Sequence, residues 1–156
     1  MDKQTFSRSV LHCQTKLYRV SMAIMGSYAD AEDAASEAIA RAWEKRGTLK
    51  SPEYFETWLI CILINVCRAE KRRQKRHPVS ELDDLIPAPE AEDSGITEIL
   101  QSIDEKYRLP LILHCALGMD IQSTAEVLHI TVNAARWRLR RGKALVKEKW
   151  TEEANR

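Results

Sequence analysis

The sequence has little that interrupts a helix or cross-links a chain. Of its 156 residues, 5 are glycine and 5 are proline, so tight turns and helix breaks are few. The 4 cysteines are Cys13, Cys61, Cys67 and Cys115, and no two of them form a C-x-x-C pair. The spacings typical of zinc sites and disulfide frameworks are therefore missing. We predict small buried cysteines in a reducing compartment, and no metal or cofactor.

Long hydrophobic runs are also absent. No apolar run reaches the roughly 18 residues that a membrane span needs, and the N-terminus lacks the apolar core of a signal peptide. The hydrophobic content of 44% nevertheless argues against wholesale disorder. These features predict a soluble, cytoplasmic protein.

Basic residues are missing from one stretch of the chain. Residues 77–105 contain no Lys or Arg and 9 acidic residues, a net charge of −9. Residues 1–76 hold 14 basic and 9 acidic residues (+5), and residues 106–150 hold 9 basic and 3 acidic residues (+6). The formal net charge of +1 for the whole chain is therefore a cancellation. Such asymmetry between segments indicates nucleic-acid binding.

Apolar residues recur at intervals of three or four almost throughout, which predicts an all-α fold. The expected helices cover about 6–24, 29–46, 52–75, 96–103, 108–117, 120–128 and 132–148, with Ser51 as N-cap and Pro52 at the first helical position of the third. Residues 77–95 are acidic, proline-containing and aperiodic, which is typical of a linker. We predict two small helical domains, 1–76 and 96–150, joined by a flexible acidic linker at 77–95.

The last two helices predict a helix-turn-helix in the C-terminal domain. A short helix with Ala125 inside is followed by a tight turn, by Thr131 as N-cap and by a strongly basic helix. The expected buried stripe of that helix is Val132, Ala135, Leu139 and Val146. Its candidate DNA-binding residues are Asn133, Arg136, Trp137, Arg138, Arg140 and Arg141, since such side chains reach base edges or hold phosphates. The plainer alternative is a solvated basic helix with a buried tryptophan.

The long third helix carries a second candidate cluster. Its expected core residues are Phe55, Trp58, Leu59, Ile62, Leu63 and Val66, while Asn65, Arg68, Arg72 and Lys75 share another face. Asn65 is a polar residue within an apolar segment, where a helix interior rarely favours one. It either hydrogen-bonds an unstacked base beside cations that hold the strand, or caps or bridges groups within the core. The pattern leaves these alternatives equal.

The second helix has an acidic face. Its outward stripe is Asp30, Asp33, Glu37, Arg41 and Glu44, and its expected inward stripe is Ala35, Ala38, Ile39 and Ala42. The acidic stripe is either a partner-binding surface or a solvated face on which Glu37 and Arg41 form an i,i+4 pair.

Together these blocks resemble the bacterial extracytoplasmic-function (ECF) sigma factors of the sigma-70 family. The first block is Asp30-Ala-Glu-Asp33 with Glu37 and Arg41-Ala-Trp43, and the second is Trp58-Leu59 with Ile62, Asn65 and Arg72-Arg73. The third is Ala125-Glu-Val-Leu128 with Ile130, Arg136, Arg138, Leu139 and Arg141. The resemblance covers roughly residues 6–76 and 96–147, and the three blocks occur in the family's order.

The resemblance implies a factor that binds core RNA polymerase, directs it to promoters and assists their opening. By resemblance, the clamp helices of the polymerase β′ subunit are bound by Asp30, Asp33, Glu37, Arg41 and Trp43. The minus-ten element is bound as a melted strand by Leu49, Lys50, Ser51, Trp58, Asn65, Arg68, Arg72 and Arg73. The basic helix named above binds the minus-thirty-five duplex. Further implied partners are the polymerase β flap and an anti-sigma factor, often at the membrane; no small-molecule substrate is implied.

Two departures from the family limit what the resemblance transfers. Trp137 stands where Ser is common, and Asn133-Ala134-Ala135 stands where Gly-Thr-Val is common. The bases read in the minus-thirty-five element therefore do not transfer to this chain.

Two other classes of function fit the sequence less well. An ordinary helix-turn-helix regulator with an N-terminal helical interaction domain leaves the Asp30–Trp43 block unexplained. An enzyme would need a nucleophile with a base and an orienting group, and the adjacent His12 and Cys13 do not supply that set. We predict that the chain is not an enzyme.

Overall fold

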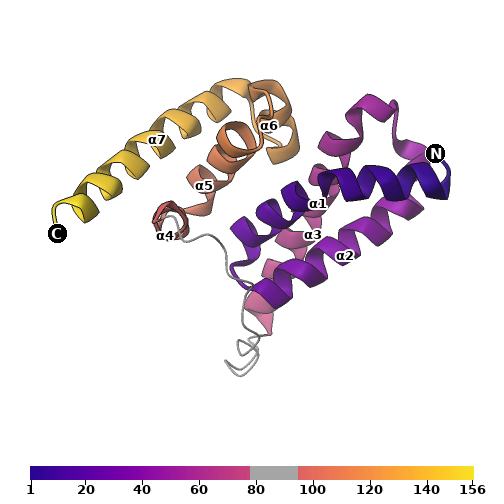
Figure 1. Ribbon diagram of the computed structural model, residues 1–156, viewed down its shortest axis with the longest axis horizontal. Coiled ribbons are helices and arrows are strands. Elements are labelled where there is room, and N and C mark those ends of the chain that lie inside the picture. Colours follow the sequence, from indigo (N-terminus) through magenta and orange to yellow (C-terminus); the bar gives the residue numbers. More distant parts are fainter. Residues whose placement is uncertain (78–94) are drawn as a thin grey trace. The chain divides into compact units, whose positions relative to one another are not determined.

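The computed structural model describes residues 1–77 and 95–156, which belong to two compact helical units (Figure 1). Helices and turns make up these residues, and no strand occurs among them. The prediction of an all-α fold in two helical units is therefore confirmed. The predicted linker at 77–95, with Pro78, Pro87 and Pro89, lies outside the described residues except for its two end residues, His77 and Gly95. None of the described helices is long and apolar enough to cross a membrane.

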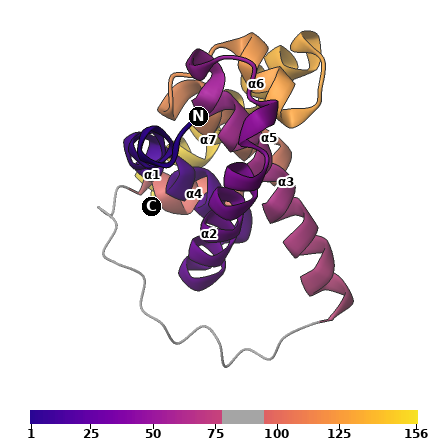
Figure 2. The same ribbon diagram turned by 90° about the vertical axis from the view of Figure 1, so that its right-hand side faces the viewer.

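The N-terminal unit is a bundle of three helices that pack against one another (Figures 1 and 2). They are α1 (Lys3–Met25), α2 (Tyr28–Glu44) and α3 (Phe55–Arg76), with the short 3-10 turns η1 (Arg46–Thr48) and η2 (Pro52–Tyr54) between α2 and α3. The Asp2 carboxylate caps α1 by accepting a 2.7 Å hydrogen bond from the Thr5 N–H. Gly26 ends α1 at a φ of 73°, a left-handed conformation that glycine adopts without a steric penalty.

The buried stripe of α2 differs from the predicted one. Ala31, Ala34, Ala38 and Ala42 are buried, whereas the predicted Ala35 and Ile39 are only partly buried. The helix has alanines on two adjacent stripes, so periodicity alone did not select between them. The buried Ser21 hydroxyl donates a 2.7 Å hydrogen bond to the Ala31 carbonyl, which joins α1 to α2 at the start of this stripe.

Helix α3 is buried over a wide arc. Leu59, Ile60, Leu63, Ile64 and Cys67 are each 0% exposed, because α3 packs on both α1 and α2. The single predicted stripe was therefore too narrow.

The predicted start and edges of α3 also need correction. Trp58 and Ile62 lie at the edge of the buried arc, only partly buried. Ser51 and Pro52 begin the 3-10 turn η2 without a side-chain cap. The α-helix itself begins at Phe55.

The C-terminal unit contains α4 (Ile96–Ser102), α5 (Glu105–Leu111), the π-helical segment η4 (Ile112–Ala116), α6 (Ile121–Leu128) and α7 (Val132–Ala154). The predicted helix over 108–117 is thus divided into α5 and η4, near Pro110, which has no N–H to donate. The widened turn is closed by a 2.9 Å hydrogen bond from the Leu117 N–H to the Ile112 carbonyl. Cys115 in η4 is exposed and Cys61 in α3 is only partly buried, so the prediction of buried cysteines is confirmed for Cys13 and Cys67 and was wrong for Cys115.

Helix α7 runs six residues beyond its predicted end and packs closely on α5 at Gly142. A Cβ atom at Gly142 would lie 3.0 Å from Leu111 Cδ1, 3.1 Å from Leu111 Cγ and 3.3 Å from the Tyr107 carbonyl oxygen. The two helices therefore approach at a distance that only glycine allows without rearrangement.

We predict that Gly142→Val destabilises the C-terminal unit by about 1–3 kcal/mol, because the added atoms overpack the α5–α7 contact. Hydrogen exchange of α5 and α7 amides measures the change. Ala144→Val, at an exposed position two residues later, is the matched control and should change the opening free energy by less than Gly142→Val. Equal effects of the two substitutions would contradict the packing account.

Candidate nucleic-acid and partner interfaces

The acidic face predicted for α2 is on the surface. Asp33, Glu37, Arg41 and Glu44 are exposed, and Asp30 is partly buried. Glu37 and Arg41 form the i,i+4 ion pair foreseen as the plainer alternative, with Arg41 Nη2 2.6 Å from Glu37 Oε1. Exposed pairs of this kind contribute little to stability, so the pair leaves the face available to a partner.

A hollow of about 220 Å³ lies between this face and α3. It is lined by Asp30, Asp33, Ala34, Glu37, Val66 and Glu70. Four of these six side chains are carboxylates, so negative charge is concentrated around the hollow. Its chemistry fits a basic side chain of a protein partner.

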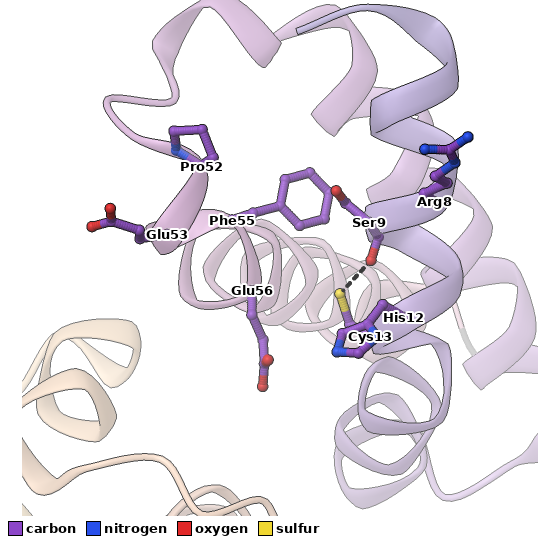
Figure 3. A pocket seen from close by; sticks show the side chains of 8 residues that line it. All are labelled: Arg8, Ser9, His12, Cys13, Pro52, Glu53, Phe55 and Glu56. Carbon is purple, nitrogen blue, oxygen red and sulfur yellow. Dashed lines mark hydrogen bonds between the residues drawn. The ribbon is translucent and has the colours of Figure 1, made fainter.

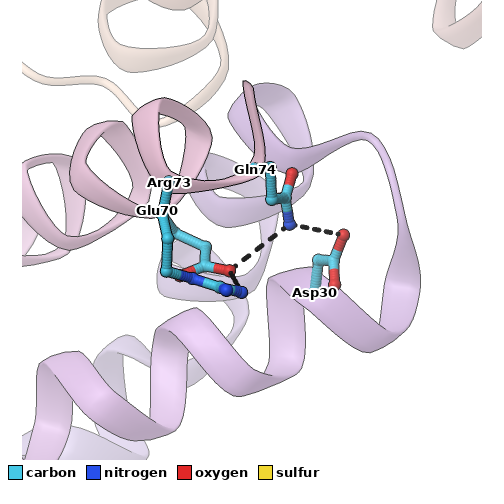
Figure 4. Close-up of polar contacts among 4 residues, drawn as sticks. All are labelled: Asp30, Glu70, Arg73 and Gln74. Carbon is cyan, nitrogen blue, oxygen red and sulfur yellow. Dashed lines mark hydrogen bonds and ion pairs between the residues drawn. The ribbon is translucent and has the colours of Figure 1, made fainter. Parts of the chain in front are cut away.

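A polar network connects α2 and α3 beside this hollow (Figure 4). Gln74 Nε2 donates hydrogen bonds to Asp30 Oδ2 at 3.1 Å and to Glu70 Oε1 at 3.5 Å. Arg73 donates to both Glu70 oxygens, from Nε at 2.9 Å and from Nη2 at 2.5 Å. The hydrogen bonds from Arg73 lower the pKa of the Glu70 carboxyl, so Glu70 is ionised at neutral pH.

Two predicted site residues, Arg73 and Trp43, are held by contacts within the protein. Arg73 is held by Glu70 on the side of α3 that faces α2, so the structure does not bring it together with Asn65. Trp43 packs edge-on against Phe6, with ring centroids 5.2 Å apart, and the Arg46 guanidinium lies 3.8 Å from its ring centroid. Trp43 is therefore a partly buried anchor for the end of α2.

The loop between α2 and α3 is fastened by Trp58. Its indole Nε1 donates a 3.3 Å hydrogen bond to Thr48 Oγ1, and its ring packs on Phe55 with centroids 5.7 Å apart. Of the loop residues predicted to contact DNA, Lys50 is exposed while Leu49 and Ser51 are partly buried. Trp58 therefore positions the loop at the N-terminal end of α3.

Asn65 is exposed on α3, between the buried Ile64 and Val66. Its side chain makes no hydrogen bond with any of the described residues, so the alternative that it caps or bridges groups within the core was wrong. Arg72 lies seven residues later, two turns along the same face, and Arg68 flanks it. The structure thus places the exposed Asn65 and Arg72 on one strip of α3 with the partly buried Trp58 and Arg68.

A second hollow, of about 380 Å³, lies between α1 and the start of α3 (Figure 3). It is lined by Arg8, Ser9, His12, Cys13, Pro52, Glu53, Phe55 and Glu56. Burial raises the pKa of the Cys13 thiol, and its Sγ donates a 2.8 Å hydrogen bond to the Ser9 carbonyl. A reactive cysteine needs the opposite shift.

One acidic group that lines this hollow has a basic partner. Glu56 is paired with Lys16 at 2.7 Å, which links α1 to α3. Among residues 1–77 and 95–156, no three or more His, Cys, Asp and Glu side chains are grouped to hold a metal ion.

The turn between α6 and α7 has the geometry of a helix-turn-helix. Asp120 caps α6 by accepting a 2.7 Å hydrogen bond from the Ser123 N–H. His129 ends α6 in a left-handed conformation, with a φ of 56°. The Ile130 N–H then bonds to the Ala125 carbonyl at 3.0 Å, and Thr131 Oγ1 caps α7 by accepting from the Ala134 N–H at 3.1 Å. The predicted turn and N-cap are confirmed.

The outer face of α7 carries most of the predicted DNA-binding residues. Asn133, Arg136, Trp137, Arg140 and Arg141 are exposed, and Arg138 is partly buried. Ala135 and Leu139 are buried as predicted, whereas Val132 and Val146 are only partly buried. Trp137 is 54% exposed, so the alternative with a buried tryptophan was wrong. Its ring contacts Tyr107 of α5, with centroids 5.9 Å apart.

Sequence reasoning missed the partners that position these residues. The i,i+3 spacing of Glu70 and Arg73 could have indicated their pairing. The contacts of Gln74 with Asp30, of Thr48 with Trp58 and of Tyr107 with Trp137 join residues distant in sequence, and no local pattern marks them.

These features define a helical protein in two units, one of which contains a helix-turn-helix with a cationic outer face. Comparison with known families identifies the family of each unit. Residues 10–77 match Sigma-70 region 2, and residues 95–146 match Sigma-70 region 4. The chain belongs to the sigma-70 family, in its ECF group.

Individual relatives agree with this family. The chain is 31% identical to the probable RNA polymerase sigma factor RfaY of Xanthomonas campestris pv. campestris, over 93% of this chain and 40% of that protein. It is 24% identical to the ECF RNA polymerase sigma factor SigM of Mycobacterium tuberculosis, over 92% of this chain and 76% of that protein. The chain thus spans less than half the length of RfaY.

A solved structure shares the fold. The sigma factor RpoE of Bartonella quintana, crystallised with the anti-sigma factor NepR, superposes with a TM-score of 0.78 at 18% identity, covering 92% of this chain and 94% of that one.

The Asp120 cap predicts an acid-sensitive contribution to the stability of the helix-turn-helix. The hydrogen bond from the Ser123 backbone lowers the pKa of the Asp120 carboxyl in the folded chain. The stabilisation is therefore present above the unfolded value of about 3.9 and is lost as the pH falls through the folded-state pKa.

Asp120→Asn keeps a capping side chain and removes this titration. In urea unfolding followed by circular dichroism, the stability difference between wild type and variant should be larger at neutral pH than at the lowest pH at which both remain folded. A pH-independent difference would show that the Asp120 charge contributes nothing.

Proposed function

We propose that this chain is a bacterial transcription initiation factor that binds core RNA polymerase, directs it to promoters and helps to open them. The observation that supports this most is the separation of charge on the structure. Carboxylates line the face of α2, whereas exposed cations accompany Asn65 on α3 and cover the outer face of α7. A protein partner with basic side chains and two DNA elements are the ligands that these surfaces fit.

In this proposal each unit has its own role. Residues 1–76 bind the polymerase and the melted minus-ten element, residues 96–150 bind the minus-thirty-five duplex, and residues 77–95 link them. The clamp helices of β′ contact Asp30, Asp33, Glu37 and Arg41 on α2. Trp43 anchors the C-terminal end of α2. The β flap is a further polymerase contact.

The proposal assigns no covalent chemistry to the chain, since the polymerase supplies it. The protein acts in the cytoplasm, and an anti-sigma factor holds it inactive, in some cases at the membrane. Support for this partner comes from RpoE of Bartonella quintana, which was crystallised with the anti-sigma factor NepR.

The direct test is in vitro transcription by bacterial core polymerase over a library of randomised promoters, with and without the full chain. We expect transcripts from a subset of promoters that share two motifs, one near minus ten and one near minus thirty-five. No added initiation, or no co-purification with core polymerase, would refute the proposal. Tight binding to a palindromic duplex without polymerase would instead identify an ordinary helix-turn-helix regulator.

Asp33→Lys is expected to weaken binding to core polymerase about tenfold or more, because it places a cation in the carboxylate hollow. Affinity is measured by titrating labelled protein with core polymerase at fixed salt. Glu32→Lys makes the same charge change at an exposed position of α2 outside the hollow, and it should bind nearly as wild type does. An equal loss for both variants would refute a specific docking face.

Asn65→Ala is expected to leave the fold and the affinity for core polymerase unchanged, because the side chain is exposed. It should reduce the equilibrium constant for open-complex formation about fivefold, the effect of losing one hydrogen bond worth about 1 kcal/mol. Permanganate reactivity of melted thymines measures opening. Lys71→Ala removes an exposed cation from another side of α3 and is the control. A normal yield of open complex from Asn65→Ala would refute the assignment.

A further inference from the structure

Trp137 occupies the centre of the outward face of α7. Asn133 lies one turn before it, and Arg140 and Arg141 lie one turn after it. Its side chain is 54% exposed. A large apolar ring with a single N–H donor is therefore held in water on a face whose neighbouring side chains are an amide and cations.

The Trp137 indole contacts a second aromatic ring. Tyr107 of α5 lies with its ring centroid 5.9 Å from that of Trp137, at an interplanar angle of 50°. Lys106 Nζ lies 5.0 Å from the centroid of the Tyr107 ring. The Tyr107 backbone lies at the close α5–α7 contact, where its carbonyl oxygen would be 3.3 Å from a Cβ at Gly142. The backbone that carries the Tyr107 ring is thus held by the packing of the two helices, which lowers the entropy lost on binding.

The chemistry of the indole selects among the groups that DNA presents. Phosphates need cations or several donors, which the neighbouring arginines supply. The edges of guanine, adenine and cytosine in the major groove present hydrogen-bonding groups, whereas thymine also presents an apolar C5-methyl group. We propose that Trp137 reads a thymine methyl group in the duplex bound by α7, and that Tyr107 is its positioning residue. This inference rests on the proposed function of α7 in binding the minus-thirty-five element.

Replacing thymine by uracil tests this directly, because the two bases differ only by the methyl group. The full chain with core polymerase is titrated with duplex promoter carrying the selected motif, in which each minus-thirty-five deoxythymidine is replaced in turn by deoxyuridine. Wild type should lose about fourfold in affinity at one position, the effect of one buried methyl group. In Trp137→Ala the two duplexes should bind equally at that position.

Matched variants separate this role from general effects. Trp150 is 53% exposed on the same helix, so Trp150→Ala removes a comparable indole and should keep the fourfold discrimination. Tyr107→Phe preserves the ring contact and should also keep it, whereas Tyr107→Ala should reduce it. Trp137→Phe retains an apolar ring and should still favour thymine, and it serves as the second variant if Trp137→Ala fails to fold in a circular dichroism melt.

The results of these titrations distinguish a failure of the Trp137 inference from a failure of the proposed function. Sequence-specific binding of the minus-thirty-five element with equal affinity for thymine and uracil at every position overturns the inference and leaves the proposed function standing. Discrimination that survives in a folded Trp137→Ala variant also overturns the inference. Absence of any sequence-specific minus-thirty-five binding overturns the proposed function and this inference together.

Discussion

The packing of α3 against both α1 and α2 is the constraint on which the N-terminal surface depends. Leu59, Ile60, Leu63, Ile64 and Cys67 are completely buried, and together they occupy one contiguous side of the helix. Only one strip of its middle turns remains exposed, and Asn65 lies on that strip. The side chain proposed to meet a base is thus exposed because every alternative orientation of α3 would remove large apolar residues from the core.

The packing of α3 against α2 also determines which charged side chains of α3 lie beside the acidic face of α2. Since α2 packs on one side of α3, Glu70 and Gln74 face its acidic surface and hold Arg73 there (Figure 4). Arg72, one residue away, faces the other direction. In the C-terminal unit, the close approach at Gly142 has an analogous effect, because it fixes Tyr107 beneath Trp137. In each unit, packing decides which polar or aromatic groups reach a ligand.

Periodicity, caps and charge were enough to predict the helical class, the order of the helices and the helix-turn-helix turn with Thr131 as cap. They did not separate the Ala31 stripe from the Ala35 stripe, because both are spaced alike and the choice depends on how α2 packs against α1 and α3. The sequence also could not predict whether Asn65 and Trp137 are exposed, since an isolated polar or aromatic residue fits a core or a surface. Which alternative holds depends on contacts between segments distant in sequence, and no local pattern records these.

The central claim is that the exposed strip of α3 contacts melted DNA while α2 contacts polymerase. A photo-crosslinking amino acid at Ala69, exposed one turn after Asn65, and another at Ala40, exposed beside Glu37 and Arg41, test it in one open complex. We expect crosslinks from position 69 to one strand of the minus-ten region and from position 40 to the β′ subunit. Crosslinks from position 69 to polymerase alone, or from position 40 to DNA, would contradict it.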